Sequence, residues 1–330
     1  MSRYRQGYLD YLWHKFGTDH FKRLFAVMSQ RNKHTLLRHV NDDRLSFPVF
    51  FILVKDIIKL GSFAELSPRN RAAVQICADK MTIPGWEEGS KAIYDNDVLH
   101  ETLLWMFNTG KNWDGTGRDR EEFDMMIDYA ASLLVIMFDD RTVLPDIIDI
   151  IFRRNRKGFY IHDLVWGFFQ TLDWETLALN AKRLLSEEQN DVELACRLLH
   201  LEPPAAIDRT VMQKQYEEYT QWLAENRPYL YLTGEHFQQL SNPTHFDCDI
   251  EAKYLGKEIS PHSMMPIEPL SEPEVESLKN FRAVGDQERK MLADYSCKLR
   301  RRNMREWDEW MHKDITQQVI AAQTGYEVIR

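Results

Sequence analysis

Glycine and proline are both scarce in this chain of 330 residues, at 14 and 12 residues. Their scarcity excludes collagen-like and low-complexity chains, which depend on one or both residue types. Long apolar runs are also missing. The most hydrophobic stretch, 47–60, is interrupted by Pro48, Lys55 and Asp56 and is too short to cross the ~30 Å hydrocarbon core of a bilayer. Because the chain begins without an apolar signal segment, we expect neither secretion nor a transmembrane helix.

Cysteine is rare as well. The four cysteines, Cys77, Cys196, Cys248 and Cys297, are far apart and form no C-x-x-C pair. Neighbouring thiolates are the usual ligands of structural zinc, so we expect no zinc site of that kind. Widely spaced, reduced cysteines are typical of the cytoplasm, where disulfides seldom persist. The sequence therefore indicates a cytoplasmic protein.

Positive charge is in deficit, with a net charge of −9 and a pI near 5.7. Such a balance argues against a dedicated nucleic-acid coat. The charge is nevertheless uneven: residues 1–60 carry 11 Lys and Arg against 5 Asp and Glu, a net of +6, whereas 61–201 carry −9 and 202–330 carry −6. The basic segment could bind an acidic partner, a nucleic acid or an anionic membrane, or it could complement the acidic middle of its own chain.

Apolar residues are plentiful, at 44% of the chain, and they include 17 Phe, 13 Tyr and 9 Trp. They recur with the 3.6-residue period of a helix in nearly every periodic segment. The sequence therefore predicts an all-α fold, either an irregular HEAT-like α-solenoid or a plain globular multi-helix domain. The expected helices cover residues 19–40, 48–60, 67–83, 96–110, 123–138, 145–156, 161–172, 174–185, 191–201 and 206–226.

Three regions are expected from the changes in composition. Residues 1–226 form the helical domain. Residues 227–285 form a mixed, extended and linker-like segment, with a short strand at 229–232 and four prolines between 257 and 275. Residues 286–330 form a long amphipathic C-terminal helix. The linker-like segment also contains Met264 and Met265, which suit a segment that covers another surface better than one exposed to solvent.

The C-terminal segment is the clearest single element. It has no Pro and no Gly between 286 and 324, and a helix of that length would reach roughly 55–60 Å at ~1.5 Å per residue. Such a helix is long enough to pack on another chain; the alternative is a helix that lies across the N-terminal domain and can be broken at the arginine cluster. The candidate interaction residues are Leu292, Tyr295, Leu299, Arg300, Arg301, Arg302, Trp307, Trp310 and Met311, together with Met264 and Met265.

Catalytic motifs are absent from the sequence. His100-Glu101 lacks the second His of H-E-x-x-H, and no G-x-S-x-G elbow or phosphate-binding glycine loop occurs. His245, Asp247 and Asp249 alternate as a metal-ligand set on a strand would, but a surface loop explains them as well. We expect no cofactor and no metal.

The leading hypothesis is a non-enzymatic scaffold, adaptor or structural subunit that binds a protein partner, or a second copy of itself, through its C-terminal arm. A helical enzyme with a dispersed site around groups such as His100 or His162 is the alternative. Nucleic-acid binding through 1–60 or 298–305 is the weaker one.

Overall fold

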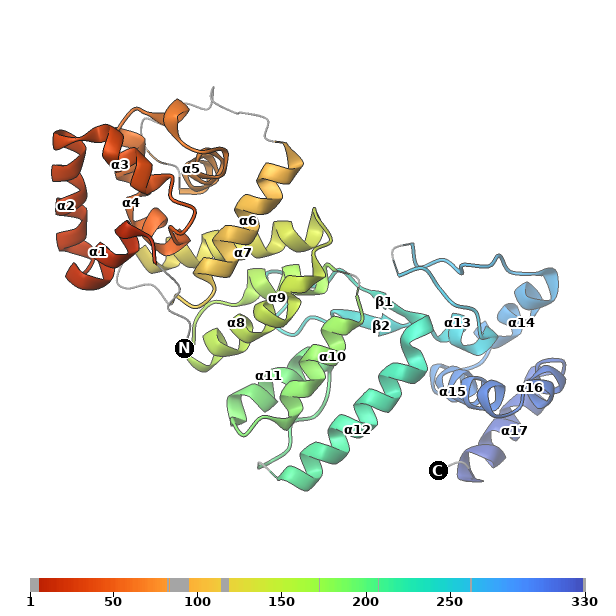
Figure 1. The fold of residues 1–330 in the computed structure, drawn as a ribbon. Helices are drawn as coiled ribbons and strands as arrows, with labels where there is room; N and C mark the ends of the chain where they lie inside the picture. Colours follow the sequence, from red (N-terminus) through yellow and green to blue (C-terminus); the bar gives the residue numbers. More distant parts are fainter. Residues whose placement is uncertain are drawn as a thin grey trace. The chain divides into compact units, whose positions relative to one another are not determined.

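The protein is all-α in the computed structural model, as the helical period predicts (Figure 1). The structure describes residues 6–81, 83, 95–113, 119–171, 173–206, 208–261 and 263–328. In these residues 17 α-helices accompany one sheet of two three-residue strands. The prediction of an all-α multi-helix fold is therefore confirmed, whereas the finer prediction of a HEAT-like solenoid stays a prediction.

Two compact units divide the chain. Unit 1 consists of Met1–Arg154 and Asp163–Thr171, and unit 2 consists of Asn155–His162 and Leu172–Arg330. The domain boundaries predicted at 226 and 285 both lie inside unit 2, and they stay a prediction.

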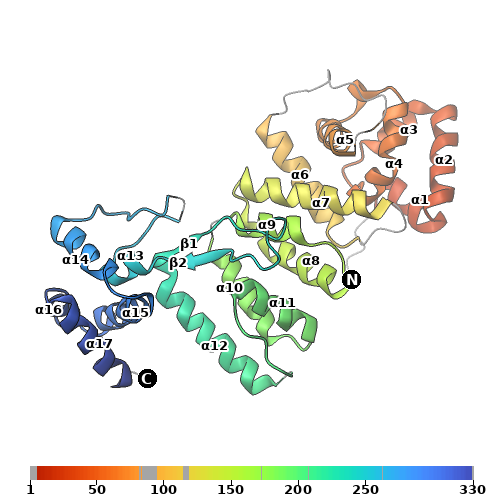
Figure 2. The ribbon, with the colours of Figure 1, turned by 180° about the vertical axis from the view of Figure 1, so that it is seen from behind.

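Unit 1 is entirely helical in its described residues. It contains α1 (Tyr8–Phe16), α2 (Thr18–Arg31), α3 (Lys33–Val40), α4 (Phe47–Lys59), η1 (Phe63–Glu65), α5 (Pro68–Met81), α6 (Asn96–Gly110), α7 (Asp119–Ile136), η3 (Arg141–Val143), α8 (Leu144–Arg156) and α9 (His162–Phe169). The last two residues of α8 and the first of α9 belong to unit 2. The helix α6 lies beside α5 and α7 in both ribbon views (Figure 2).

The apolar run 47–60 becomes α4, the buried helix that the sequence predicts. Nine of its residues are buried, so it has contacts on nearly every side. The ring of Phe47 stacks on Phe123 at 5.5 Å and meets Trp105 edge-on at 5.5 Å. Trp105 in turn donates its indole N–H to the carbonyl of Leu45 at 2.7 Å. These contacts join α4, α6 and α7 into one core.

A buried ion cluster joins α7 to α8. The Arg154 guanidinium lies 2.6 Å from the Asp128 carboxylate and 3.0 Å from that of Asp124, and the Arg154 and Asp128 side chains are each 6% exposed. Burial raises the pKa of Asp128, and the neighbouring Arg154 charge opposes that rise. The sequence suggests only that Arg154 complements the helix dipole at the end of its helix. The structure instead pairs it with carboxylates from another helix.

Unit 2 contains helices and the only sheet among the described residues. Its elements are α10 (Glu175–Ala181), η4 (Lys182–Leu185), α11 (Gln189–Leu199), α12 (Arg209–Asn226), η5 (Arg227–Tyr229), β1 (Leu230–Leu232), β2 (Phe246–Cys248), α13 (Ile250–Leu255), α14 (Glu272–Arg282), α15 (Asp286–Arg302), α16 (Met304–Met311) and α17 (Ile315–Val328). The strands pair antiparallel, with Tyr231 opposite Asp247. The short strand predicted at 229–232 is thus found, one residue shorter.

The segment expected to be linker-like holds two helices, α13 and α14. Asp249 caps α13, because its carboxylate accepts the backbone N–H groups of Glu251 and Ala252 at 2.9 and 3.0 Å. A reciprocal capping box between Ser271 and Glu274 begins α14, and proline is compatible with its first turn. The four prolines therefore did not make this whole segment extended.

The C-terminal segment is not one continuous helix, and the structure has the break at the arginine cluster that the alternative allows. The segment folds into α15, α16 and α17, with breaks at Asn303 and before Ile315. Asn303 has extended backbone angles, and its side chain accepts the N–H groups of Arg305 and Glu306 at 3.2 and 3.4 Å. Asp314 caps α17 in the same way through the N–H of Gln317 at 3.1 Å. Side-chain caps end a helix without Gly or Pro, so the scarcity of both residues does not exclude such breaks.

His245 precedes β2 and is only 3% exposed. Its Nδ1 lies 3.2 Å from the carbonyl of Glu235, and burial lowers its pKa to about 4 from the ordinary 6.5. The unfolded chain therefore binds a proton at this histidine below pH 6.5, whereas the folded chain binds it only near pH 4. Folding stability is lost as the pH falls through this window.

We expect His245→Gln to remove this component of acid sensitivity. Between pH 7 and pH 4 the wild-type protein should lose on the order of 3 kcal/mol more than the variant, in urea unfolding followed at each pH. The substitution His312→Gln, at an exposed histidine, is the matched control for the change of residue type. Parallel pH profiles for the wild type and His245→Gln would contradict this assignment.

No helix among the described residues is long and apolar enough to span a bilayer.

Candidate interaction surface

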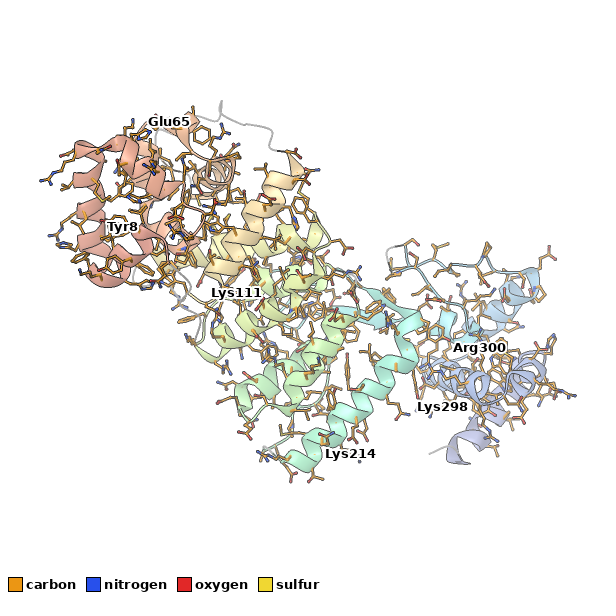
Figure 3. The ribbon with its side chains drawn as sticks, in the orientation of Figure 1. Tyr8, Glu65, Lys111, Lys214, Lys298 and Arg300 are labelled. Atoms are coloured by element: carbon orange, nitrogen blue, oxygen red, sulfur yellow. The ribbon has the colours of Figure 1, made fainter. Side chains whose placement is uncertain are left out.

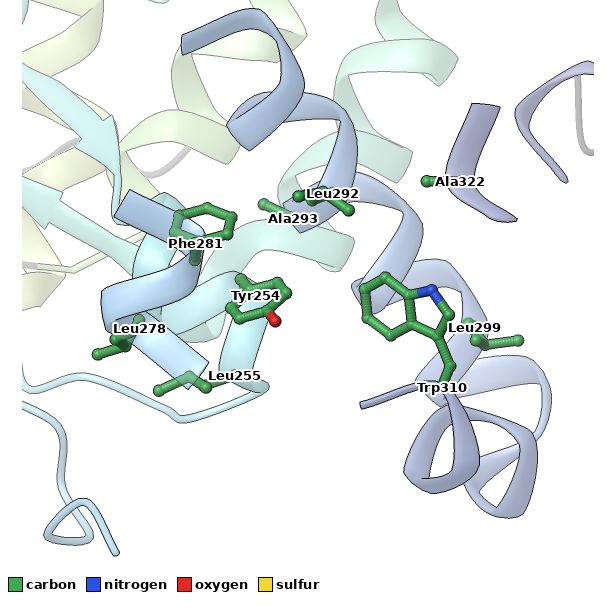
Figure 4. Close-up of a cluster of buried hydrophobic side chains, with 9 residues drawn as sticks. All are labelled: Tyr254, Leu255, Leu278, Phe281, Leu292, Ala293, Leu299, Trp310 and Ala322. Carbon is green, nitrogen blue, oxygen red and sulfur yellow. The ribbon is translucent and has the colours of Figure 1, made fainter. Parts of the chain in front are cut away.

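Three of the predicted interaction residues lie in a buried core of unit 2. Leu292, Leu299 and Trp310 are 0%, 6% and 2% exposed. Figure 4 shows this core, in which α13, α14, α15, α16 and α17 each contribute side chains. At its centre the rings of Tyr254 and Phe281 stack at 4.3 Å, and Trp310 meets Tyr254 edge-on at 6.0 Å. These apolar side chains are thus covered within their own chain.

Tyr295, Trp307 and Met311 are half-buried against the same core. The Trp307 indole donates its N–H to the Ser296 hydroxyl at 2.8 Å, and the Tyr295 ring lies 5.4 Å from that of Trp310. The C-terminal segment therefore has the apolar face that the sequence predicts, but this face packs against residues 250–282 instead of facing solvent.

The arginine cluster is also partly engaged. The guanidinium of Arg300, which Figure 3 labels, donates to the carbonyl of Gly256. It lies 5.4 Å from the centroid of the Trp307 ring. Arg301 donates to the backbone carbonyl of Glu225. Arg302 is exposed at the end of α15. Arg301 and Arg302 are thus both exposed, whereas Arg300 is partly buried.

The two predicted methionines have the opposite environment. Met264 and Met265 are 51% and 64% exposed, and the nearby Ile267 is 59% exposed. We call these three side chains the apolar tip. Ile267 was not among the predicted interaction residues, although it lies next to Pro266 and three residues after Met264 in the sequence.

Backbone hydrogen bonds hold the apolar tip in a defined turn. The N–H of Ser260 donates to the carbonyl of Met265 at 2.9 Å, and the N–H of Ile267 donates to that of Glu258 at 2.8 Å. Ile259 pairs with Pro266 as an antiparallel bridge, and Ile259 itself is 3% exposed. Met264 has a φ of 57°, a left-handed conformation uncommon for a residue with a side chain. The tip is therefore a tethered hairpin and not an extended linker.

The two other histidines considered in the sequence lie in different units. His100 lies 2.9 Å from the Asp140 carboxylate in unit 1, whereas His162 stacks on Phe237 at 5.2 Å in unit 2. Within the described ranges no group of three or more His, Cys, Asp or Glu side chains has the arrangement of a metal site. Asp249, one member of the alternating set, is used as a helix cap.

Comparison with known proteins identifies no relative of this chain. The chain matches no protein-family model, no curated protein and no solved structure.

Proposed function

We propose that this protein is a cytoplasmic adaptor or structural subunit that binds a protein partner through the apolar tip of unit 2. The observation that carries the proposal is the exposure of Met264, Met265 and Ile267 on a turn that backbone hydrogen bonds hold in shape. Large apolar side chains grouped at one exposed place mark interaction sites more often than isolated ones do. A pre-shaped turn also loses little conformational entropy on binding.

Methionine suits such a contact. Its flexible thioether adapts to irregular apolar partners, and methionine is enriched in interfaces. The cytoplasmic assignment is supported by the four free cysteines, of which Cys77, Cys196 and Cys297 are buried in the structure. The C-terminal helices support the proposal indirectly, because their own apolar side chains build the core of Figure 4.

Changing Met264, Met265 and Ile267 together to serine is expected to weaken partner binding by about 100-fold or more. The reason is that each side chain would bury an apolar area worth about 1.5 kcal/mol or more. The measurement is crosslinking mass spectrometry in the cells of origin, followed by affinity measurement with the protein that crosslinks to residues 258–268. Sedimentation of the purified chain tests whether that partner is a second copy.

The matched control is Met304→Ser, which removes a methionine that is 55% exposed on α16 of the same unit. The control should keep the full affinity. Equal affinity of the triple variant and the wild type would overturn the proposal, as would crosslinks that map only to other surfaces.

A further inference from the structure

A second feature of unit 2 is a groove between the end of α11, the middle of α12 and β2. It has a volume of about 570 Å³, which is the size of a small-molecule site. The apolar tip belongs to a different segment and contributes none of its lining residues.

Aromatic rings form a continuous wall of this groove. Trp222 lies 5.5 Å from Tyr219 and 6.2 Å from Phe246, measured between ring centroids. The His200 ring lies 6.2 Å from Phe246 on the other side. The π-faces of such rings carry partial negative charge, and Trp attracts cations most strongly.

Carboxylates add negative charge at the rim of the groove. Glu218 and Asp247 line it, and both are exposed. The Asp247 carboxylate accepts the backbone N–H of Cys248 at 2.7 Å, and Glu218 has an exposed partner, Lys214, at 3.7 Å. A solvated ion pair at that distance is weak, so it leaves much of the Glu218 charge available to a ligand.

We infer that this groove binds a small organic cation, an alkylammonium. The aromatic wall would hold the ammonium by cation–π attraction, and the rim carboxylates would complement its charge. This combination favours a cation over a neutral or anionic molecule of the same shape.

Choline and its uncharged carbon isostere, 3,3-dimethylbutan-1-ol, are the probes that test this inference. Titration of the full chain is followed by the NMR signal of the Trp222 indole, assigned with Trp222→Phe. Choline should shift that signal and bind about 10-fold or more tightly than the alcohol. The double variant Glu218→Gln with Asp247→Asn should weaken the binding of choline and leave the affinity for the alcohol unchanged.

The matched control is Glu217→Gln, which removes an exposed carboxylate of α12 that does not line the groove. It should bind choline as the wild type does. Equal affinity for choline and the alcohol would show an apolar site only and would overturn the inference. Choline at about 100 mM would occupy even a very weak site. Absence of any shift of the Trp222 signal at that concentration would therefore also overturn the inference.

Discussion

Changing Arg154 to methionine is expected to lower the free energy of unfolding of unit 1 by about 3–5 kcal/mol. The Arg154 guanidinium holds two carboxylates, and its own side chain is only 6% exposed. Without it, the Asp128 carboxylate would remain buried with no countercharge. Hydrogen exchange at the amides of α7 and α8 measures the loss, since it reports on unit 1 separately from unit 2.

A second change distinguishes the loss of the charge pair from the loss of packing. In Arg154→Met, neutralising Asp128 with Asp128→Asn should recover a large part of the stability, because no buried charge remains. The deficit of the single variant should also shrink as the pH falls, since Asp128 can then take up a proton. A deficit that is independent of pH and unrelieved by Asp128→Asn would contradict the role assigned to this cluster.

Changing Trp310 to alanine is expected to cost about 3–5 kcal/mol, which is the range for removing a buried aromatic side chain. Trp310 is 2% exposed, and its ring contacts both Tyr254 and Tyr295. Its loss would leave a cavity among α13, α15 and α17. The amides of α15 should then exchange faster by the corresponding factor.

The control for Trp310 is Met304→Ala, which is on the same helix but 55% exposed. It should change stability by less than about 0.5 kcal/mol. If Trp310→Ala were equally mild, the core of Figure 4 would not be a stabilising core, and the helices would be free to pack on another chain.

The helical fold was predictable because it depends on local periodicity. The stretch 123–138 is apolar almost all round, and it becomes α7, with Phe123, Met126 and Leu134 buried. Similarly, Ser67 and Pro68 correctly marked the start of α5. Both features are encoded within a few residues of each other.

Long-range pairings were not predictable. Arg154 and Asp128 are 26 residues apart, and nothing between them shows that they pair. The same holds for the apolar residues of the C-terminal segment. Their period shows that Leu292 and Leu299 face one side of a helix, but it does not show that Tyr254 and Phe281 cover that side. The groove was missed for this reason too, since Trp222 and Phe246 come from elements joined only by tertiary packing.

The central claim is that the C-terminal helices are covered within their own chain, so that the apolar tip is left as the partner surface. Hydrogen exchange of the purified protein, measured at two concentrations 100-fold apart, on the order of 0.1 and 10 μM, tests it most directly. We predict slow exchange in the buried turns of α15 at both concentrations. Fast exchange of α15 that becomes slow only at the higher concentration or with a partner would contradict the account.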